Sequence, residues 1–136
     1  MAIFGIGAYY TDKNLDMTDS FLSKEVACIG WSNKDGHPLY NLMKYIKIGD
    51  IIYIKAQPAN IGLIIKAVGI VLNNNIHRVP GTGEGCIKTK WIWKGNIVLG
   101  KINDSCRPIR NLTLYEELNP KIQNEVLNLL LLQFKL

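Results

Sequence analysis

The stretch IIYIKAQPANIGLIIKAVGIVL, Ile51–Leu72, decides the fold. Residues 51–56 and 62–72 are almost continuously apolar, which is typical of strands that are buried on both faces. The Pro58-Ala-Asn60 segment between them is short, so the two strands are expected to pair as a hairpin. Strands covered on both sides fit a closed or strongly curled sheet. We therefore predict a curled sheet at the centre of the molecule.

Strands and short helices are expected to alternate before this hairpin. Residues 2–10 and 26–31 are rich in β-forming residues and are predicted to be strands. Thr18 is a candidate N-cap for a helix through residue 24, and Pro38 suits the first position of a helix that ends near residue 46. Four residues of that second helix fall at helical spacing and predict one buried stripe: Leu39, Leu42, Met43 and Ile46.

A polar loop is predicted over residues 73–85, followed by a second hairpin whose strands, 87–93 and 97–102, flank Lys94-Gly-Asn96. The loop contains Gly81-Thr-Gly-Glu-Gly85, which has the glycine content of a phosphate-binding loop. A phosphate-binding loop also needs a following helix and a suitably placed lysine, and neither is present. We interpret this segment as a flexible loop that can close over a ligand.

The last element, residues 119–134, is predicted to be a helix capped by Asn119, with Pro120 at its first position. Its apolar residues form two stripes: Ile122, Val126, Leu129 and Leu130 in one, and Leu127, Leu131 and Phe134 in the other. We expect this helix to cover an open side of the sheet and to leave leucine surface for a homodimer. The chain as a whole, residues 1–136, is predicted to be one α+β domain.

The composition and the cysteine spacing predict in which cellular compartment the protein is found. No apolar stretch approaches the roughly 20 residues needed to cross a bilayer, so no membrane partner is expected. The apolar run at the N-terminus has no basic residue before it, unlike a secretory leader. Three widely spaced cysteines, Cys28, Cys86 and Cys106, fit reduced thiols in the cytoplasm better than disulfides or a zinc site.

The positive charge of the chain is concentrated in one segment. The net charge is +5, and residues 78–110 contain seven basic and two acidic residues. A positive segment favours an anionic partner, either a nucleic acid or a nucleotide, although a solvated basic face is the plain alternative. The candidate phosphate-binding residues are Lys88, Lys90, Lys94, Arg107 and Arg110. Strand alternation is expected to put the three lysines opposite Trp91 and Trp93.

Neither a catalytic group nor a metal site emerges from the sequence. His37 and His77 are isolated from each other and from the cysteines, so no metal-ligand pattern is present. No nucleophile motif occurs, and the adjacent Glu116 and Glu117 are interpreted as acids near the start of a helix. We therefore expect a protein without a cofactor, a metal or an enzymatic activity.

The segment Cys28-Ile-Gly-Trp-Ser-Asn33 places a tryptophan where a predicted strand ends. An indole ring at such an exit offers a flat face on which a nucleobase can stack. An isolated tryptophan is more often part of the core, so a buried Trp31 is the alternative. The neighbouring basic segment favours the stacking role.

The order of these motifs resembles the PUA-like superfamily, in particular its YTH and EVE branches. The resemblance covers roughly residues 2–112 and rests on Ile29-Gly-Trp-Ser32, on the central strands from Asp50 to Val71, and on Lys88-Thr-Lys-Trp-Ile-Trp93. It implies a curled mixed sheet or barrel and recognition of a modified base in an aromatic cage. The loop 73–85 departs from the pattern, because it has no aromatic residue to supply the second cage wall.

The leading prediction is a non-enzymatic module that binds a base, expected to be modified, in DNA or RNA. Trp31 is expected to stack on the base, and the other candidate ligand-binding residues are Tyr9, Tyr10, Lys55, Gln57, His77 and Trp93. His77, Trp93 or Tyr10 would replace the missing cage wall. The alternatives are a sensor for a free or signalling nucleotide, and a protein-interaction module that uses the leucine-rich helix.

Overall fold

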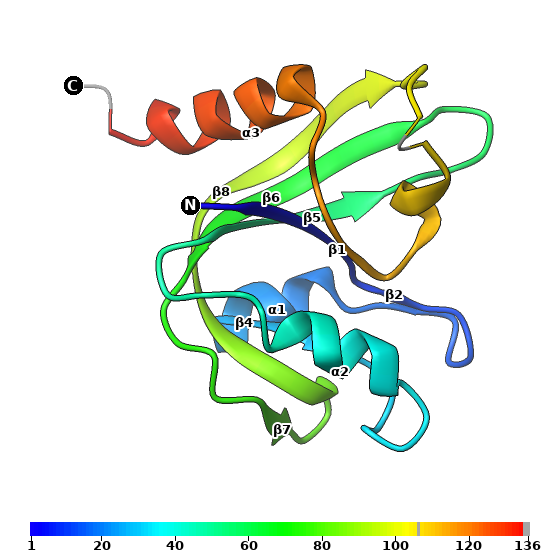
Figure 1. The fold of residues 1–136 in the computed structure, drawn as a ribbon, viewed down its shortest axis with the longest axis vertical. Coiled ribbons are helices and arrows are strands. Elements are labelled where there is room, and N and C mark those ends of the chain that lie inside the picture. Colours follow the sequence, from blue (N-terminus) through cyan, green and yellow to red (C-terminus); the bar gives the residue numbers. More distant parts are fainter. Residues whose placement is uncertain (106, 135–136) are drawn as a thin grey trace.

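The centre of the molecule is a strongly curled β-sheet with helices on both of its sides (Figure 1). The computed structural model describes residues 1–105 and 107–134, with the side chain of Arg107 left out. Along the main sheet the strand order is β4-β8-β6-β5-β1-β9, and β7 pairs with β8. Only β1 and β5 pair in parallel; the remaining pairs are antiparallel. The prediction of an α+β fold with a curled mixed sheet is confirmed.

The strands of the main sheet are β1 (Ile3–Gly7), β4 (Val26–Ile29), β5 (Ile51–Ala56), β6 (Leu63–Val71), β7 (His77–Val79), β8 (Gly83–Gly100) and β9 (Leu114–Glu116). A two-stranded sheet is formed by β2 (Tyr9–Tyr10) and β3 (Leu15–Asp16). The helices are α1 (Thr18–Lys24), α2 (His37–Met43) and α3 (Pro120–Leu132), with one 3-10 turn, η1 (Arg107–Asn111).

The central hairpin is buried on both faces, as its continuous apolar sequence predicts. Along β5, Ile51 and Tyr53 pack in the layer covered by α3. Ile52 and Ile54 point the other way and pack in the layer that contains residues of α1, α2 and β4. Two separate core layers therefore share one sheet, and every side chain of β5 up to Ile54 is buried.

One long strand stands where the second hairpin was predicted. β8 continues through Gly95 and Asn96 without a turn; its first half pairs with β4 and β7 and its second half with β6. Residues 95 and 96 lie at a shift in the register with β6, next to Lys66. The Gly-Asn signal thus marks a bulge, and bulges bend a strand and increase its twist. The hairpin prediction is wrong.

A second register shift in β8 separates its two tryptophans. Trp91 lies beside Gly69, whereas Trp93 lies beside Val68, so Ile92 is the extra residue. Trp91 packs on the layer of α1 and α2, and its indole N–H donates to the carbonyl of Val26 at 3.0 Å. Trp93 packs on the layer covered by α3. The expectation that strict alternation puts both rings on one face is therefore wrong.

Cys28 and Cys86 are directly paired residues of the neighbouring strands β4 and β8, and they form a disulfide. The expectation of reduced thiols is wrong for this pair. The two residues are 58 positions apart in the sequence, so their proximity comes from strand pairing that the spacing does not reveal. Cys106 lies outside the described residues.

The C-terminal helix forms as predicted. The side chain of Asn119 accepts hydrogen bonds from the backbone N–H groups of Lys121 and Ile122, which caps α3. The first apolar stripe of the helix is buried against β6 and β8. Of the second stripe, Leu127 packs partly buried against the same core, whereas Leu131 and Phe134 are exposed. In Figure 1, α3 lies on the side of the sheet opposite α1 and α2.

Candidate ligand-binding site

The main cavity opens where the parallel strands β1 and β5 end. Gly7 and Lys55, the partners at the end of this strand pair, both line it. Its volume is about 600 Å³. Side chains and backbone from β2, β3 and the exit of β4 complete the wall. The lining residues are Gly7, Ala8, Tyr9, Thr11, Asp16, Thr18, Trp31, Lys55, Ala56, Gln57, Pro58, Lys66, Asn111 and Thr113.

Lys55 reaches this cavity near the end of β5. The register between β5 and β6 shifts between Ile54 and Lys55, where the extra residue is Lys66 of β6, so β5 itself stays regular. Gly7 lies directly against this side chain, since a Cβ at position 7 would be in ordinary contact with Lys55 Cε at 3.4 Å. Lys55 Nζ is 6.0 Å from the centroid of the Tyr115 ring and forms no ion pair with a described residue. Burial lowers the pKa of the Lys55 amine to about 8.

The Lys55 amine is expected to titrate near pH 8 in the folded protein. Burial of a charged amine favours its neutral form, so the unfolded chain binds the proton more tightly between pH 8 and the ordinary lysine pKa. The stability contributed by this group therefore rises as the pH rises through that window. NMR of the protein with reductively methylated lysines measures the titration, and the signal lost in Lys55→Arg assigns it. A Lys55 signal that titrates only above pH 10 would contradict the burial of this amine.

Gln57, which lines the main cavity, also carries a polar group without a partner in the described structure. The Oε1 atom of Gln57 is buried and has no hydrogen-bond partner among the described residues. Buried polar atoms are usually hydrogen-bonded, so this oxygen, in a residue that lines the cavity, has an unused capacity to accept a hydrogen bond. On another part of the wall, Lys66 and Asp16 form an ion pair at 2.6 Å and satisfy each other. Lys55 and Gln57 are therefore two residues of this wall that carry a polar group without a partner in the described structure.

Trp31 and Tyr9 supply exposed aromatic surface. Trp31 is 45% exposed and Tyr9 is 53% exposed, so Trp31 is not the core residue of the alternative interpretation. Both also line a small cavity of about 30 Å³ next to the main one. The backbone at Trp31 is held in place, because the hydroxyl of Tyr40 on α2 donates to its carbonyl at 2.8 Å.

Three predicted ligand-binding residues are not part of the main cavity. Tyr10 is buried, and its hydroxyl donates to the carbonyl of Thr82 at 2.7 Å, so it lies behind the exposed rings. Trp93 lines a separate hollow with Trp91. His77 is on β7 and contacts the carbonyl of Asn75 at 2.8 Å. The structure therefore brings together Trp31, Tyr9, Lys55 and Gln57 only.

The three lysines of β8 are exposed, but they lie at different distances from the cavity. Lys94 lines a hollow of about 370 Å³ whose wall shares Asp16, Thr18 and Lys66 with the main cavity. Lys90 lies 3.9 Å from Glu25 in an exposed ion pair, and Lys88 is exposed on the same strand. Lys94 thus lines a hollow that adjoins the site.

Arg110 is not available for phosphate, contrary to the prediction. Its side chain is 1% exposed and lies between two carboxylates, those of Asp104 and Glu117. Each carboxylate accepts two hydrogen bonds from the guanidinium. The side chain of Arg107 lies outside the described part of the structure.

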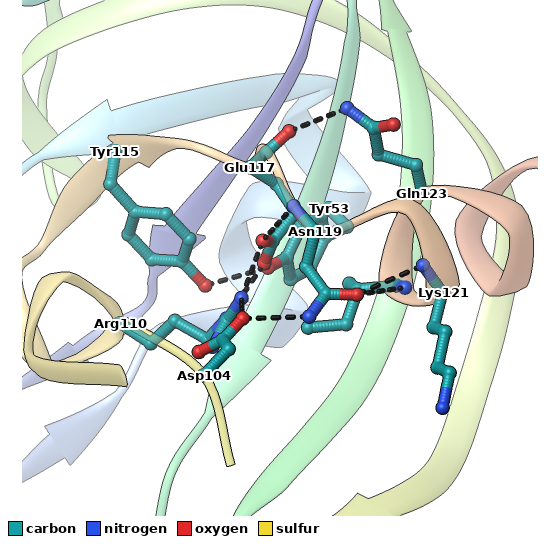
Figure 2. Close-up of polar contacts among 9 residues, drawn as sticks. Tyr53, Asp104, Arg110, Tyr115, Glu117, Asn119, Lys121 and Gln123 are labelled. Carbon is teal, nitrogen blue, oxygen red and sulfur yellow. Dashed lines mark hydrogen bonds and ion pairs between the residues drawn. The ribbon is translucent and has the colours of Figure 1, made fainter. Parts of the chain in front are cut away.

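Figure 2 shows the buried network around Arg110. The Tyr53 hydroxyl from β5 donates to Glu117 at 2.7 Å and contacts the Tyr115 hydroxyl at 2.7 Å. Asn119, the cap of α3, donates to Asp104 at 2.6 Å. Glu117 is therefore a structural ion-pair partner rather than a helix-dipole residue. The network ties the segment before α3 to the central sheet.

Within residues 1–105 and 107–134, no group of three or more His, Cys, Asp or Glu side chains is placed to hold a metal ion. In the same part of the chain, no helix has the length and apolar character to span a membrane.

No family model and no curated protein matches the sequence. Among solved structures, the chain is similar to Rpa0253 from Rhodopseudomonas palustris, a structural genomics target determined by NMR. The TM-score is 0.56 and the identity 11%, and the match covers 95% of this chain and 92% of that chain. At this identity the likeness shows a shared fold over nearly the full length.

Proposed function

We propose that this chain is a non-enzymatic, PUA-like binding module that recognises a base, preferentially a modified one, in DNA or RNA. One observation carries the proposal: two exposed aromatic rings, Trp31 and Tyr9, stand on a cavity of about 600 Å³ that also holds the unpaired groups of Lys55 and Gln57. Flat aromatic rings stack on any base, whereas polar groups distinguish one base from another by hydrogen bonds to its edge.

Each group has a role that follows from its chemistry. Trp31 stacks on the base and Tyr9 bounds the other side of the pocket. The Lys55 ammonium donates to an acceptor atom on the edge of the base, and the Gln57 oxygen accepts from a donor. Because a paired base cannot enter a cavity, the ligand is a base in a single strand or one flipped out of a duplex.

Lys94 is placed to contact the nucleic acid backbone next to the bound base. Its hollow adjoins the main cavity, and an exposed ammonium there attracts a neighbouring phosphate. A free nucleotide would use the same aromatic pocket without this contact. Salt dependence separates the two, because each phosphate neutralised on a single strand contributes about −0.7 to the slope of log K against log salt.

For a short single-stranded oligonucleotide, we expect a steeper salt dependence than for the corresponding mononucleotide. Lys94→Gln is expected to weaken all sequences alike and to reduce the slope for the oligonucleotide by about 0.7 to 1. Fluorescence anisotropy between 50 and 300 mM salt measures both quantities. Lys44→Gln, which changes an exposed lysine at the end of α2, is the matched control. Equal slopes for the oligonucleotide and the mononucleotide would favour the nucleotide sensor.

The exposed stripe of α3 favours a second role in self-association. Leu131, Leu132 and Phe134 are exposed next to one another at the end of this helix. Apolar surface of this kind marks many protein–protein contacts. We expect sedimentation velocity to show concentration-dependent dimers that Leu131→Lys abolishes. A strict monomer at high micromolar concentration would contradict this role without affecting the base-binding proposal.

A further inference from the structure

A further cavity, smaller than the main one, lies at the turn between β7 and β8. Its volume is about 110 Å³, several times the roughly 30 Å³ that a water molecule occupies in the liquid. Its wall includes Tyr10 and Gly30, which also line the small cavity at Trp31. The cavity therefore adjoins the proposed base site and has room for a small polyatomic group.

Thr82 lines this cavity and carries a buried hydroxyl without a partner in the described structure. Thr82 is only 3% exposed, and its Oγ1 atom is buried without a hydrogen-bond partner in the described structure. Leaving a hydroxyl in this state costs free energy, because buried polar atoms usually have a partner in the protein or in ordered water, and a group bound at this cavity could supply one. The Thr82 backbone is held by two hydrogen bonds, one from its N–H to the Val79 carbonyl and one from the Tyr10 hydroxyl to its own carbonyl.

The charge around the cavity favours an anion. Lys13 and Arg78 both line it, and Lys13 forms no ion pair with a described residue. Arg78 uses its Nε atom for Glu84 at 3.1 Å, which leaves its two terminal nitrogens outside that contact. Lys24 adds a further positive charge at this turn, because its Nζ donates to the carbonyl of Pro80 at 3.0 Å. Glu84 is the one carboxylate on this wall.

We propose that this cavity binds a phosphate group, with the Thr82 hydroxyl as a buried donor and Lys13 and Arg78 as the charged partners. The inference deepens the proposed function: with a nucleotide stacked on Trp31, the phosphate is the nucleotide's own. Free inorganic phosphate has the same chemistry and is the second source. The glycine-rich segment 81–85 thus contributes to a phosphate site through a β-turn, without the helix that a phosphate-binding loop normally has.

The site is tested first with inorganic phosphate, using amide NMR titrations at low ionic strength with chloride as the reference anion. We expect saturable shifts of the amides of residues 81–84. Thr82→Val is expected to weaken phosphate binding roughly tenfold or more, because it removes a hydrogen bond to a charged group. The same change should not lower the melting temperature, since it removes an unpartnered buried hydroxyl.

Matched variants make the result decisive. Arg78→Gln is expected to weaken phosphate binding by a similar factor, whereas Lys44→Gln, an exposed lysine elsewhere, is expected to leave it unchanged. Phosphate shifts that do not saturate, or an affinity that Thr82→Val leaves intact, would overturn the site. Either result would mean that the hydroxyl is not a partner of phosphate.

Nucleosides and their monophosphates distinguish the two sources. If the phosphate belongs to a stacked nucleotide, the monophosphate binds more tightly than the nucleoside, and Thr82→Val removes the difference. Trp31→Ala should weaken both of these ligands and leave inorganic phosphate unaffected. Saturable inorganic phosphate without any nucleoside or nucleotide binding would support the site and refute the proposed function.

Discussion

Arg110→Met is expected to lower the free energy of unfolding by about 3–5 kcal/mol. The guanidinium is 1% exposed and pairs with Glu117, which is also 1% exposed, and with Asp104. Although burial alone would lower the pKa of Arg110, the hydrogen bonds that its guanidinium donates to both carboxylates raise it, so the group stays charged. Methionine fills similar volume but leaves the Glu117 carboxylate buried without a cation. Urea denaturation followed by circular dichroism measures the loss.

An exposed arginine provides the control for this prediction. Arg78 pairs with Glu84 at 3.1 Å on the surface, and Arg78→Met is expected to cost less than about 1 kcal/mol. Adding Glu117→Gln to Arg110→Met should recover part of the loss, because it removes the unpaired buried charge. A loss below 1 kcal/mol for Arg110→Met alone would show that the network does not hold the segment before α3.

The parts of the fold that depend on local signals were predictable. Residues 51–56 and 62–72 are almost continuously apolar, and the structure buries β5 between two core layers. Asn119 and Pro120 mark the start of α3 because a cap acts on the backbone N–H groups directly after it. In both cases the neighbours in sequence supply the physical reason.

The parts that depend on contacts between distant segments were not predictable. The Cys28–Cys86 disulfide needs the pairing of β4 with β8, and nothing at either cysteine indicates that pairing. At Gly95, a glycine signal that often marks a turn instead marks a bulge, because β6 provides a partner on both sides of it. Arg110 has the sequence context of a surface cation, and only the approach of Glu117 explains its burial.

Some residues of the candidate site were likewise predictable from the sequence, and others were not. The PUA-like resemblance and the strand exits predict Trp31, Tyr9, Lys55 and Gln57, and all four line one cavity. Trp93 is placed elsewhere because a bulge at Ile92 changes the alternation that the prediction assumed. Thr82 carries no sequence signal for a phosphate contact, since its importance comes from a hydroxyl that is buried without a partner.

Trp31→Ala is expected to weaken the binding of a base by about 1–3 kcal/mol, or roughly 5- to 150-fold. The loss follows from removing an exposed ring that stacks on the ligand, so Trp31→Phe should retain part of the affinity. Stability should change far less than the roughly 3–5 kcal/mol expected for truncating a core tryptophan, because the side chain is 45% exposed.

The most direct measurement is a titration of wild type, Trp31→Ala and Trp31→Phe with single-stranded oligonucleotides that carry one methylated or unmethylated base. Thermal melts of the same samples separate binding from folding. We expect the affinity to decrease from wild type to Trp31→Phe and further to Trp31→Ala, while the three melting temperatures stay closely similar. An unchanged affinity in Trp31→Ala, or an unfolded variant, would contradict the assignment of this cavity as a base-binding site.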